Sequence, residues 1–115
     1  MTDSCIFCKI VSKEAKAEIV YRDDQVTAFR DIHPVAPTHL LLVPNKHIES
    51  VATLGTEDEQ LMGHIFTVAR KLAEDERIDK GGYRLITNTG ADGGQTVFHL
   101  HVHLIGGQRM RYPMG

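Results

Sequence analysis

The sequence predicts an α+β fold: a five-stranded, mostly antiparallel sheet with one long helix and a short N-terminal helix. Three observations lead to this expectation. Five short segments have the apolar and β-branched residues of strands and are flanked by turn residues. Residues 56–76 carry apolar side chains at helical spacing over several turns. A single long helix cannot cross over between every pair of neighbouring strands, so most pairs should be antiparallel.

The first elements are a short helix and a hairpin. Residues 6–11 are expected to form one or two helical turns, with Ser4 as the N-cap. Residues 19–22 and 26–30 read as two strands, because the polar residues 23–25 between them are typical of a turn.

A third strand and the long helix follow. Residues 39–43 lie between two prolines and are mostly apolar, which indicates a short strand. The helix is expected to begin at Thr56, which forms a capping box with Glu59. Its apolar stripe consists of Leu61, Ile65, Val68 and Leu72.

The last elements are two strands joined by a glycine-rich turn. Residues 83–87 form the fourth strand after a pair of glycines, and residues 97–105 form the fifth. Residues 90–94 are expected to form the turn between them.

Length and composition limit the possible functions. With 115 residues the chain is expected to be one domain, residues 1–115. Its net charge of −2 gives no electrostatic reason to expect a nucleic acid or an anionic membrane as partner. The polar start predicts no signal peptide and the apolar stretches are too short to span a bilayer, so we expect a cytoplasmic protein.

Three histidines alternate with apolar residues in the fifth strand: His99, His101 and His103. Alternate residues of a strand share one face, so the three imidazoles should lie on the same surface. Surface or core histidines without a function would be the simplest interpretation, but three in strict alternation are rare by chance. A single metal bound by all three is disfavoured, because residues i and i+4 of a strand lie about 13 Å apart.

Two neighbouring histidines could still bind one ion, so the three are expected to have different tasks, and nucleophilic catalysis is one of them. A neutral imidazole attacks phosphorus well when one ring nitrogen is held as N–H and the other faces the substrate. The preceding residues 88–96 are rich in small residues, whose backbone N–H groups could approach an anion. Asn88, Gln95 and Thr96 add neutral donors. This segment is therefore expected to hold a phosphate.

At this point the chain resembles the histidine triad (HIT) family. The family signature has three histidines separated by single apolar residues, and two further apolar residues follow the third histidine. It matches residues 99–105 (His-Leu-His-Val-His-Leu-Ile). The likeness extends over nearly the whole chain, and the continuation at residues 106–110 (Gly-Gly-Gln-Arg-Met) resembles the Hint branch.

The resemblance implies a function. Members of the Hint branch typically split purine nucleoside phosphoramidates and aminoacyl adenylates through a nucleotidyl-histidine intermediate, and they need no metal for the chemical step. It also implies a homodimer that joins two five-stranded sheets into one of ten strands. AMP, GMP and their phosphoramidates are the expected partners. Three alternatives stay open: a nucleotide-binding regulatory protein with incidental hydrolysis, a dinucleoside polyphosphate hydrolase, and a metal-dependent hydrolase.

The resemblance also implies roles for individual residues. His101 would be the nucleophile, with His103 at the phosphate and Thr96 at the leaving group. Asp31 would accept hydrogen bonds from the ribose hydroxyls. The phosphate would contact Asn88 and the Gly94 backbone, with Gln95 beside them. The base pocket would be lined by Ile6, Phe7, Ile10, Phe29 and Ile32.

Two cysteines, Cys5 and Cys8, have the spacing of zinc ligands, but two ligands do not make a site. Many histidine triad proteins pair such cysteines with two histidines, which here correspond to His47 and His99. The resemblance therefore implies one structural Cys₂His₂ zinc, separate from catalysis. Of the remaining histidines, His39 is expected to make a structural hydrogen bond and His64 to pack on the long helix.

Overall fold

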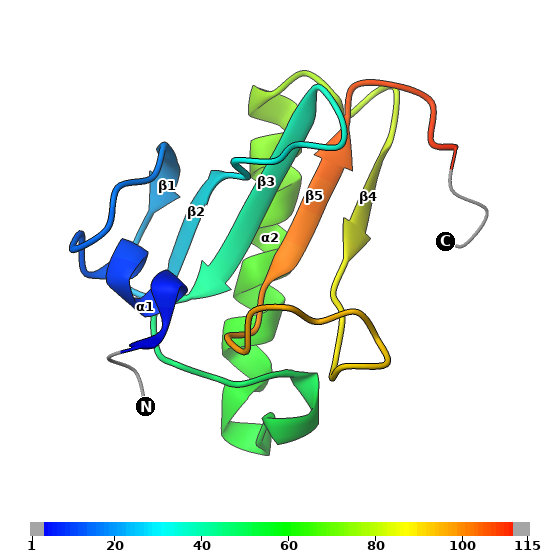
Figure 1. The fold of residues 1–115 in the computed structure, drawn as a ribbon. Helices are drawn as coiled ribbons and strands as arrows, with labels where there is room; N and C mark the ends of the chain where they lie inside the picture. Colours follow the sequence, from blue (N-terminus) through cyan, green and yellow to red (C-terminus); the bar gives the residue numbers. More distant parts are fainter. Residues whose placement is uncertain (1–3, 112–115) are drawn as a thin grey trace.

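The computed structural model describes residues 4–111 (Figure 1). Within this range the helices are α1 (Ile6–Val11) and α2 (Glu59–Asp75), with two short 3₁₀ turns, Val51–Thr53 and Thr56–Asp58, before α2. The strands are β1 (Ile19–Arg22), β2 (Val26–Arg30), β3 (Thr38–Pro44), β4 (Tyr83–Ile86) and β5 (Val102–Gly106).

The strands form one antiparallel sheet with the order β1-β2-β3-β5-β4 over the described residues. β5 is inserted between β3 and β4, so α2, which connects those two strands, crosses the sheet behind β5 (Figure 1). The predicted α+β fold with one long helix and an antiparallel five-stranded sheet is confirmed.

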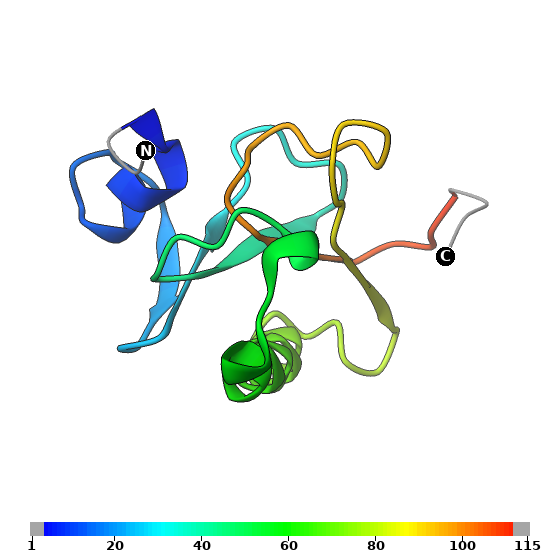
Figure 2. The same ribbon diagram turned by 90° about the horizontal axis from the view of Figure 1, so that it is seen from below.

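Strand β3 lies in the middle of the sheet and is buried along its whole length. Its side chains alternate between two cores: Leu40 and Leu42 pack with helix α2, whereas Leu41 and Val43 pack with helix α1. The two helices therefore cover opposite faces of the sheet, as the view from below shows (Figure 2). The α1 face is only partly covered, and this is the face that carries the candidate site.

Helix α1 has the predicted bounds, residues 6–11, but its N-cap differs from the prediction. Its N-cap is Cys5 and not Ser4, because the Cys5 sulfur accepts a hydrogen bond from the Cys8 backbone N–H at 3.3 Å. The expectation for Ser4 was based on hydroxyl caps, which are the usual solution. A thiol at this position brings Cys5 and Cys8 to the same end of the helix.

The β1–β2 turn is held by Asp23. One carboxylate oxygen accepts the backbone N–H groups of Gln25 and Val26, at 2.8 and 2.7 Å. The other lies 2.6 Å from both the Tyr21 hydroxyl and the His64 Nε2 atom. His64 was predicted to be a packing residue, but its ring instead connects helix α2 to this turn.

The start of the long helix also differs from the prediction. The capping box of Thr56 and Glu59 does not form: Thr56 lies in a 3₁₀ turn, and α2 begins at Glu59. The Asp58 carboxylate accepts the Gly55 N–H at 3.0 Å and makes an ion pair with Lys46. The predicted stripe does face the sheet, since Leu61, Ile65, Val68 and Leu72 belong to the core.

Strand β5 is shorter than the predicted segment 97–105, because it begins at Val102. Its ladder with β3 ends at the pair Leu42 and Val102. Pro44 has no N–H to continue the ladder, and its carbonyl oxygen lies 2.9 Å from the His99 side-chain Nε2. His99 and His101 therefore lie in the irregular segment before the strand, and only His103 lies within it.

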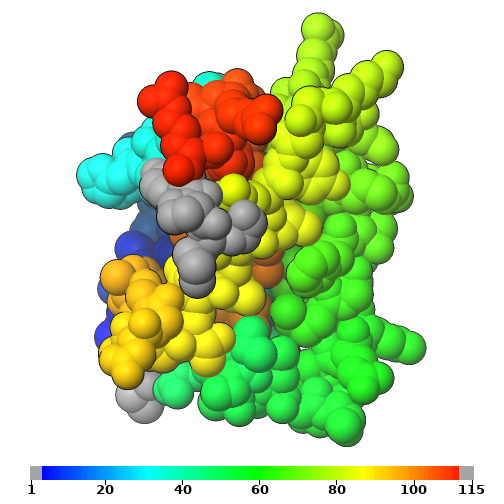
Figure 3. All heavy atoms as spheres, turned by 90° about the vertical axis from the view of Figure 1, so that its right-hand side faces the viewer, coloured from blue at the N-terminus to red at the C-terminus, as the bar shows by residue number. Residues whose placement is uncertain are grey.

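The view of the β4 side shows the segment from β4 to β5 (yellow to orange) beside helix α2 (green) (Figure 3). None of the helices between residues 4 and 111 combines the length and the apolar character needed to cross a bilayer.

Candidate active site

A groove of about 390 Å³ lies on the α1 face of the sheet, between helix α1, the end of β2 and the segment before β5. We call it the α1 groove. It brings together most of the predicted nucleotide-binding and catalytic residues. These are Ile6, Phe7, Ile10, Phe29, Asp31, Ile32, Thr96, His101 and His103.

One end of the α1 groove is apolar. Phe7, Ile10 and Phe29 are buried beneath it and belong to the α1 core, so pattern alone could not separate them from ordinary core residues. Ile6 and Ile32 are different, because their side chains are 45% and 82% exposed at the edge of the groove. Exposed apolar side chains next to buried aromatic ones suit a flat apolar ligand.

A hydrogen bond to the backbone sets the tautomer of the His101 ring. Its Nδ1 lies 2.8 Å from the backbone carbonyl oxygen of His99. A carbonyl only accepts, so Nδ1 carries the hydrogen, and the neutral ring keeps a free lone pair on Nε2. The ring packs edge-on against Phe7, with centroids 5.1 Å apart. His101 is therefore oriented and in the tautomer that a nucleophile requires.

His103 is oriented by His39 through a chain of two hydrogen bonds. The Val35 N–H donates to His39 Nδ1 at 3.1 Å, so the His39 hydrogen is on Nε2. That Nε2–H donates to His103 Nδ1 at 2.9 Å, which leaves the His103 hydrogen on its own Nε2. His103 thus has a donor free for an anion. The structural hydrogen bond expected of His39 is present.

Burial keeps His103 uncharged. It lowers the pKa of His103 to about 4, and the adjacent His101 and His39 rings act in the same direction. Burial also lowers the pKa of His39, although the Asp31 carboxylate opposes this effect. Near neutral pH the pair is therefore a neutral hydrogen-bond relay.

Acidification should reveal this burial. An unfolded histidine takes up a proton near pH 6.5, but folded His103 does so only near pH 4, so stability falls as the pH decreases between these values. His103→Asn cannot take up this proton. Between pH 7 and 5.5 we expect its free energy of unfolding to decrease by about 1 kcal/mol less than that of the wild type. Thermal unfolding of both proteins at the two pH values measures this. An equal loss of stability in the two proteins would contradict the low pKa of His103.

Asp31 lies at the polar side of the α1 groove and is half buried. One of its oxygens accepts the His33 backbone N–H at 2.8 Å, and the other lies 3.3 Å from His39 Nε2. A carboxylate has about four acceptor positions, so two partners leave room for hydroxyl donors.

In the glycine-rich segment, two of the backbone N–H groups are used for hydrogen bonds within the turn. The backbone N–H groups of Gly94 and Gln95 donate to the carbonyls of Ala91 and Gly90, both at 3.0 Å. Neither Asn88, Gly94 nor Gln95 lines the α1 groove. The turn closes on itself because Gly90 and Gly94 adopt positive φ values of 75° and 89°.

The Gln95 side chain is buried and fully used inside the protein. Its Nε2 donates to the carbonyls of Glu49 and Val97, at 2.8 and 3.0 Å, and its Oε1 accepts the Gly90 N–H at 2.9 Å. No amide hydrogen remains for a nucleotide. The Gln95 side chain therefore holds the loop in front of Thr96.

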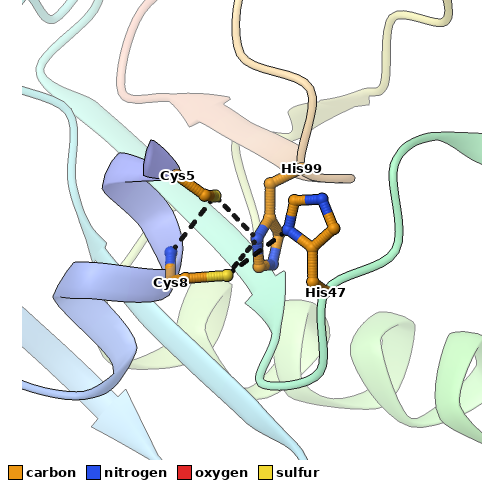
Figure 4. A group of neighbouring side chains, drawn as sticks. All are labelled: Cys5, Cys8, His47 and His99. Carbon is orange, nitrogen blue, oxygen red and sulfur yellow. Dashed lines mark hydrogen bonds between the residues drawn. The ribbon is translucent and has the colours of Figure 1, made fainter. Parts of the chain in front are cut away.

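The four predicted zinc ligands converge at the N-terminal end of α1 (Figure 4). His99 Nδ1 lies 3.3 Å from the Cys5 sulfur and 3.5 Å from the Cys8 sulfur, and His47 Nδ1 lies 3.3 Å from the Cys8 sulfur. Sulfur and nitrogen ligands of one tetrahedral zinc are separated by about 3.6 Å. The geometry therefore fits a closed Cys₂His₂ site.

The electrostatics of these ligands also fit a cation. Burial lowers the pKa of His99 to about 4, and its Nε2–H donates to Pro44, so Nδ1 presents a lone pair to the sulfurs. Burial, followed by the neighbouring Cys5, raises the pKa of Cys8 to about 11. A divalent ion would be needed to hold both sulfurs as thiolates. His99 thus belongs with the cysteines and not with the groove.

The comparisons with known proteins agree with this geometry. A model of the HIT domain matches residues 12–110 of the chain.

The chain belongs to the HIT family.

Among HIT proteins, the purine nucleoside phosphoramidase of Escherichia coli strain K12 is 53% identical over all 115 residues and is matched over 93% of its length. An uncharacterized HIT-like protein of Synechococcus elongatus is 43% identical over the full length of both chains. A HIT family hydrolase from Legionella pneumophila superimposes with a TM-score of 0.95 and 46% identity, covering 97% of this chain and 100% of that one.

Other residues of this HIT site were not found from the sequence. Lys16 and Val97 line the α1 groove but were not predicted to belong to it. The contact between His39 and His103 was not predicted either. The pairing could have been inferred from the sheet: Leu41 faces His103, and His39 is two residues from Leu41 on the same face.

Proposed function

We propose that this chain is a nucleotide-binding hydrolase that cleaves purine nucleoside phosphoramidates or aminoacyl adenylates at the α-phosphate. The observation that carries the proposal is the hydrogen bond from His101 Nδ1 to the His99 carbonyl, which leaves a lone pair on a groove-lining imidazole. Membership in the HIT family and the similarity to a purine nucleoside phosphoramidase support it.

The α1 groove divides into parts that suit a mononucleotide. The base would lie between Ile6 and Ile32 over the buried phenylalanines, and the ribose hydroxyls would donate to Asp31. The α-phosphate would then reach the two histidines, where the Nε2–H of His103 could donate to it. The phosphate contacts of Asn88, Gly94 and Gln95 stay predictions that rest on the family resemblance.

The reaction would take two steps at phosphorus. His101 Nε2 forms a bond to phosphorus while the bond from phosphorus to the amine nitrogen, or to the carboxylate oxygen of the acyl group, breaks. The amine takes up a proton from solvent near Thr96, and the attacking water returns a proton to solvent in the second step; a carboxylate leaves without one. Water then adds to phosphorus, the bond to His101 breaks and the mononucleotide leaves. His103 supports the charge that develops on the phosphate oxygens in both steps.

Zinc, where bound, would stabilise the fold from outside the groove. Cys5, Cys8, His47 and His99 would hold it, and it would connect helix α1 to the segment before β5. That segment contributes the carbonyl that orients His101. The metal thus supports the groove without reaching the substrate.

A panel of substrates tests the proposed function. We expect turnover of adenosine and guanosine phosphoramidates, much slower turnover of dinucleoside polyphosphates, and little change when a chelator is added. Binding of AMP with negligible turnover of every substrate would favour a regulatory protein. Activity that disappears with chelator and returns with metal would favour a metal-dependent hydrolase.

The proposed homodimer, which the family resemblance implies, is compatible with the sheet. Within the described part of the chain, β4 pairs on one side only, with β5, so its other edge is open to a second copy. Light scattering in solution distinguishes one chain from two.

A further inference from the structure

A second hollow of about 380 Å³ adjoins the α1 groove. We call it the Glu49 hollow. It is lined by residues 4–6, by His47 and Glu49, and by residues 96–98. Ile6, Thr96 and Val97 line both spaces, whereas His101 and His103 line only the groove. The two spaces therefore meet at Ile6, Thr96 and Val97.

The Glu49 hollow offers a place for the leaving group of the proposed reaction. In phosphoryl transfer the attacking and leaving atoms lie roughly in line across phosphorus. If His101 attacks from the groove, the leaving group points away from His101. The family resemblance places Thr96 at the leaving group, and Thr96 lines both the α1 groove and the Glu49 hollow.

The backbone at Glu49 is fixed relative to the groove. The Gln95 amide donates to the carbonyls of Glu49 and Val97, and the Leu100 N–H donates to the Ile48 carbonyl at 2.7 Å. These bonds join the 47–49 segment to the loop that carries Thr96. The buried amide of Gln95 thus positions Glu49 beside the predicted leaving-group path.

The charge of the hollow comes from Glu49. Ser4, Ile6 and residues 96–98 are uncharged, and the Cys₂His₂ set that includes Cys5 and His47 is neutral overall when two thiolates balance a divalent ion. The exposed Glu49 carboxylate lies on one wall. An ammonium group near it would be attracted, and a second phosphate or a carboxylate would be repelled.

We propose that the Glu49 hollow is the subsite for the leaving group and that Glu49 selects leaving groups that carry an ammonium group over anionic ones. This inference rests on the proposed function. It identifies the preferred class as phosphoramidates of diamines and acyl adenylates with a free amine. It also gives a physical reason for the slower cleavage that we expect for dinucleoside polyphosphates.

Three matched substrates test the proposal. They are the adenosine 5′-phosphoramidates of propylamine, 1,3-diaminopropane and β-alanine, which end in a methyl, an ammonium and a carboxylate group. Each kcat/KM is divided by that of the propylamine compound, and this ratio is compared between wild type and Glu49→Gln. The comparison between proteins cancels the intrinsic reactivity of each leaving group.

We expect Glu49→Gln to lower the ratio for the diamine and to raise the ratio for β-alanine, each by about three- to tenfold at low salt. Glu49→Lys should invert the preference, and added salt should reduce the difference in the wild type. Glu57→Gln is the matched control, since Glu57 is also exposed but lines a different hollow, near the start of α2.

The outcomes separate the two proposals. Equal ratios in the wild type, Glu49→Gln and Glu57→Gln, with all three compounds cleaved, would overturn the role of Glu49 and leave the proposed hydrolase intact. A change of the same size in Glu57→Gln would also overturn it, because the effect would then be one of net charge. If none of the three compounds is cleaved, the proposed function is wrong and this inference is wrong with it.

Discussion

Replacing His101 with glycine should lower the turnover of an adenosine phosphoramidate by at least about 1,000-fold and change AMP binding only a few-fold. The loss is large because the variant lacks the atom that attacks phosphorus. Binding persists because Ile6, Ile32 and Asp31, which are proposed to hold the base and the ribose, are unchanged in the variant. Steady-state kinetics and calorimetric titration with AMP measure the two effects.

Added imidazole provides a control for this variant. Glycine at position 101 leaves space beside Phe7, which packs against the ring in the wild type. Free imidazole should therefore restore part of the activity if the missing group is the nucleophile, and it should not do so if the substitution has disturbed the fold. A variant that keeps more than a tenth of wild-type turnover would show that another group attacks.

Purified protein should contain about one zinc per chain, and its removal should lower the melting temperature by about 10 °C or more. The effect on stability is large because the ion would join helix α1 to the segment before β5 through its four ligands. Turnover below the melting temperature should fall much less. Metal analysis and calorimetry with and without chelator test both statements.

Cys8→Ser is the matched variant for this experiment. It should melt at a lower temperature than the wild type, and chelator should shift it little further, since the closed set of ligands is already broken. A freshly reduced wild-type sample without zinc would contradict the metal site. Loss of turnover in proportion to zinc, at a temperature where the fold is intact, would instead assign the ion to the reaction.

The fold could be predicted from the sequence because its main signals are local. Apolar spacing in residues 61–72 marks the helix face that packs on the sheet. The bounds of β1 and β2 were predicted without error, since turn residues separate them. The capping predictions for Ser4 and Thr56 were wrong, because a thiol and an aspartate that makes an ion pair with Lys46 formed the competing contacts.

The start of β5 could not be predicted locally. Alternation continues from His99 to Leu104, with Leu100, Val102 and Leu104 all in the α2 core, so the pattern reads as one strand. The ladder nevertheless stops at Val102, because a proline and the His99 ring occupy the end of the neighbouring strand. Whether a strand ends depends on its partner, which lies about 60 residues away in the sequence.

The sequence by itself determined the fold class, the shared face of the three histidines and the identity of the four candidate metal ligands. Only the tertiary structure decided how the histidines divide: His99 toward the sulfurs, His101 onto a carbonyl, and His103 onto His39. It also assigned Gln95 to the loop and placed Glu49 beside the groove. The physical reason is that the tautomer of an imidazole depends on its hydrogen-bond partner, and these partners come from segments distant in the sequence or from the backbone.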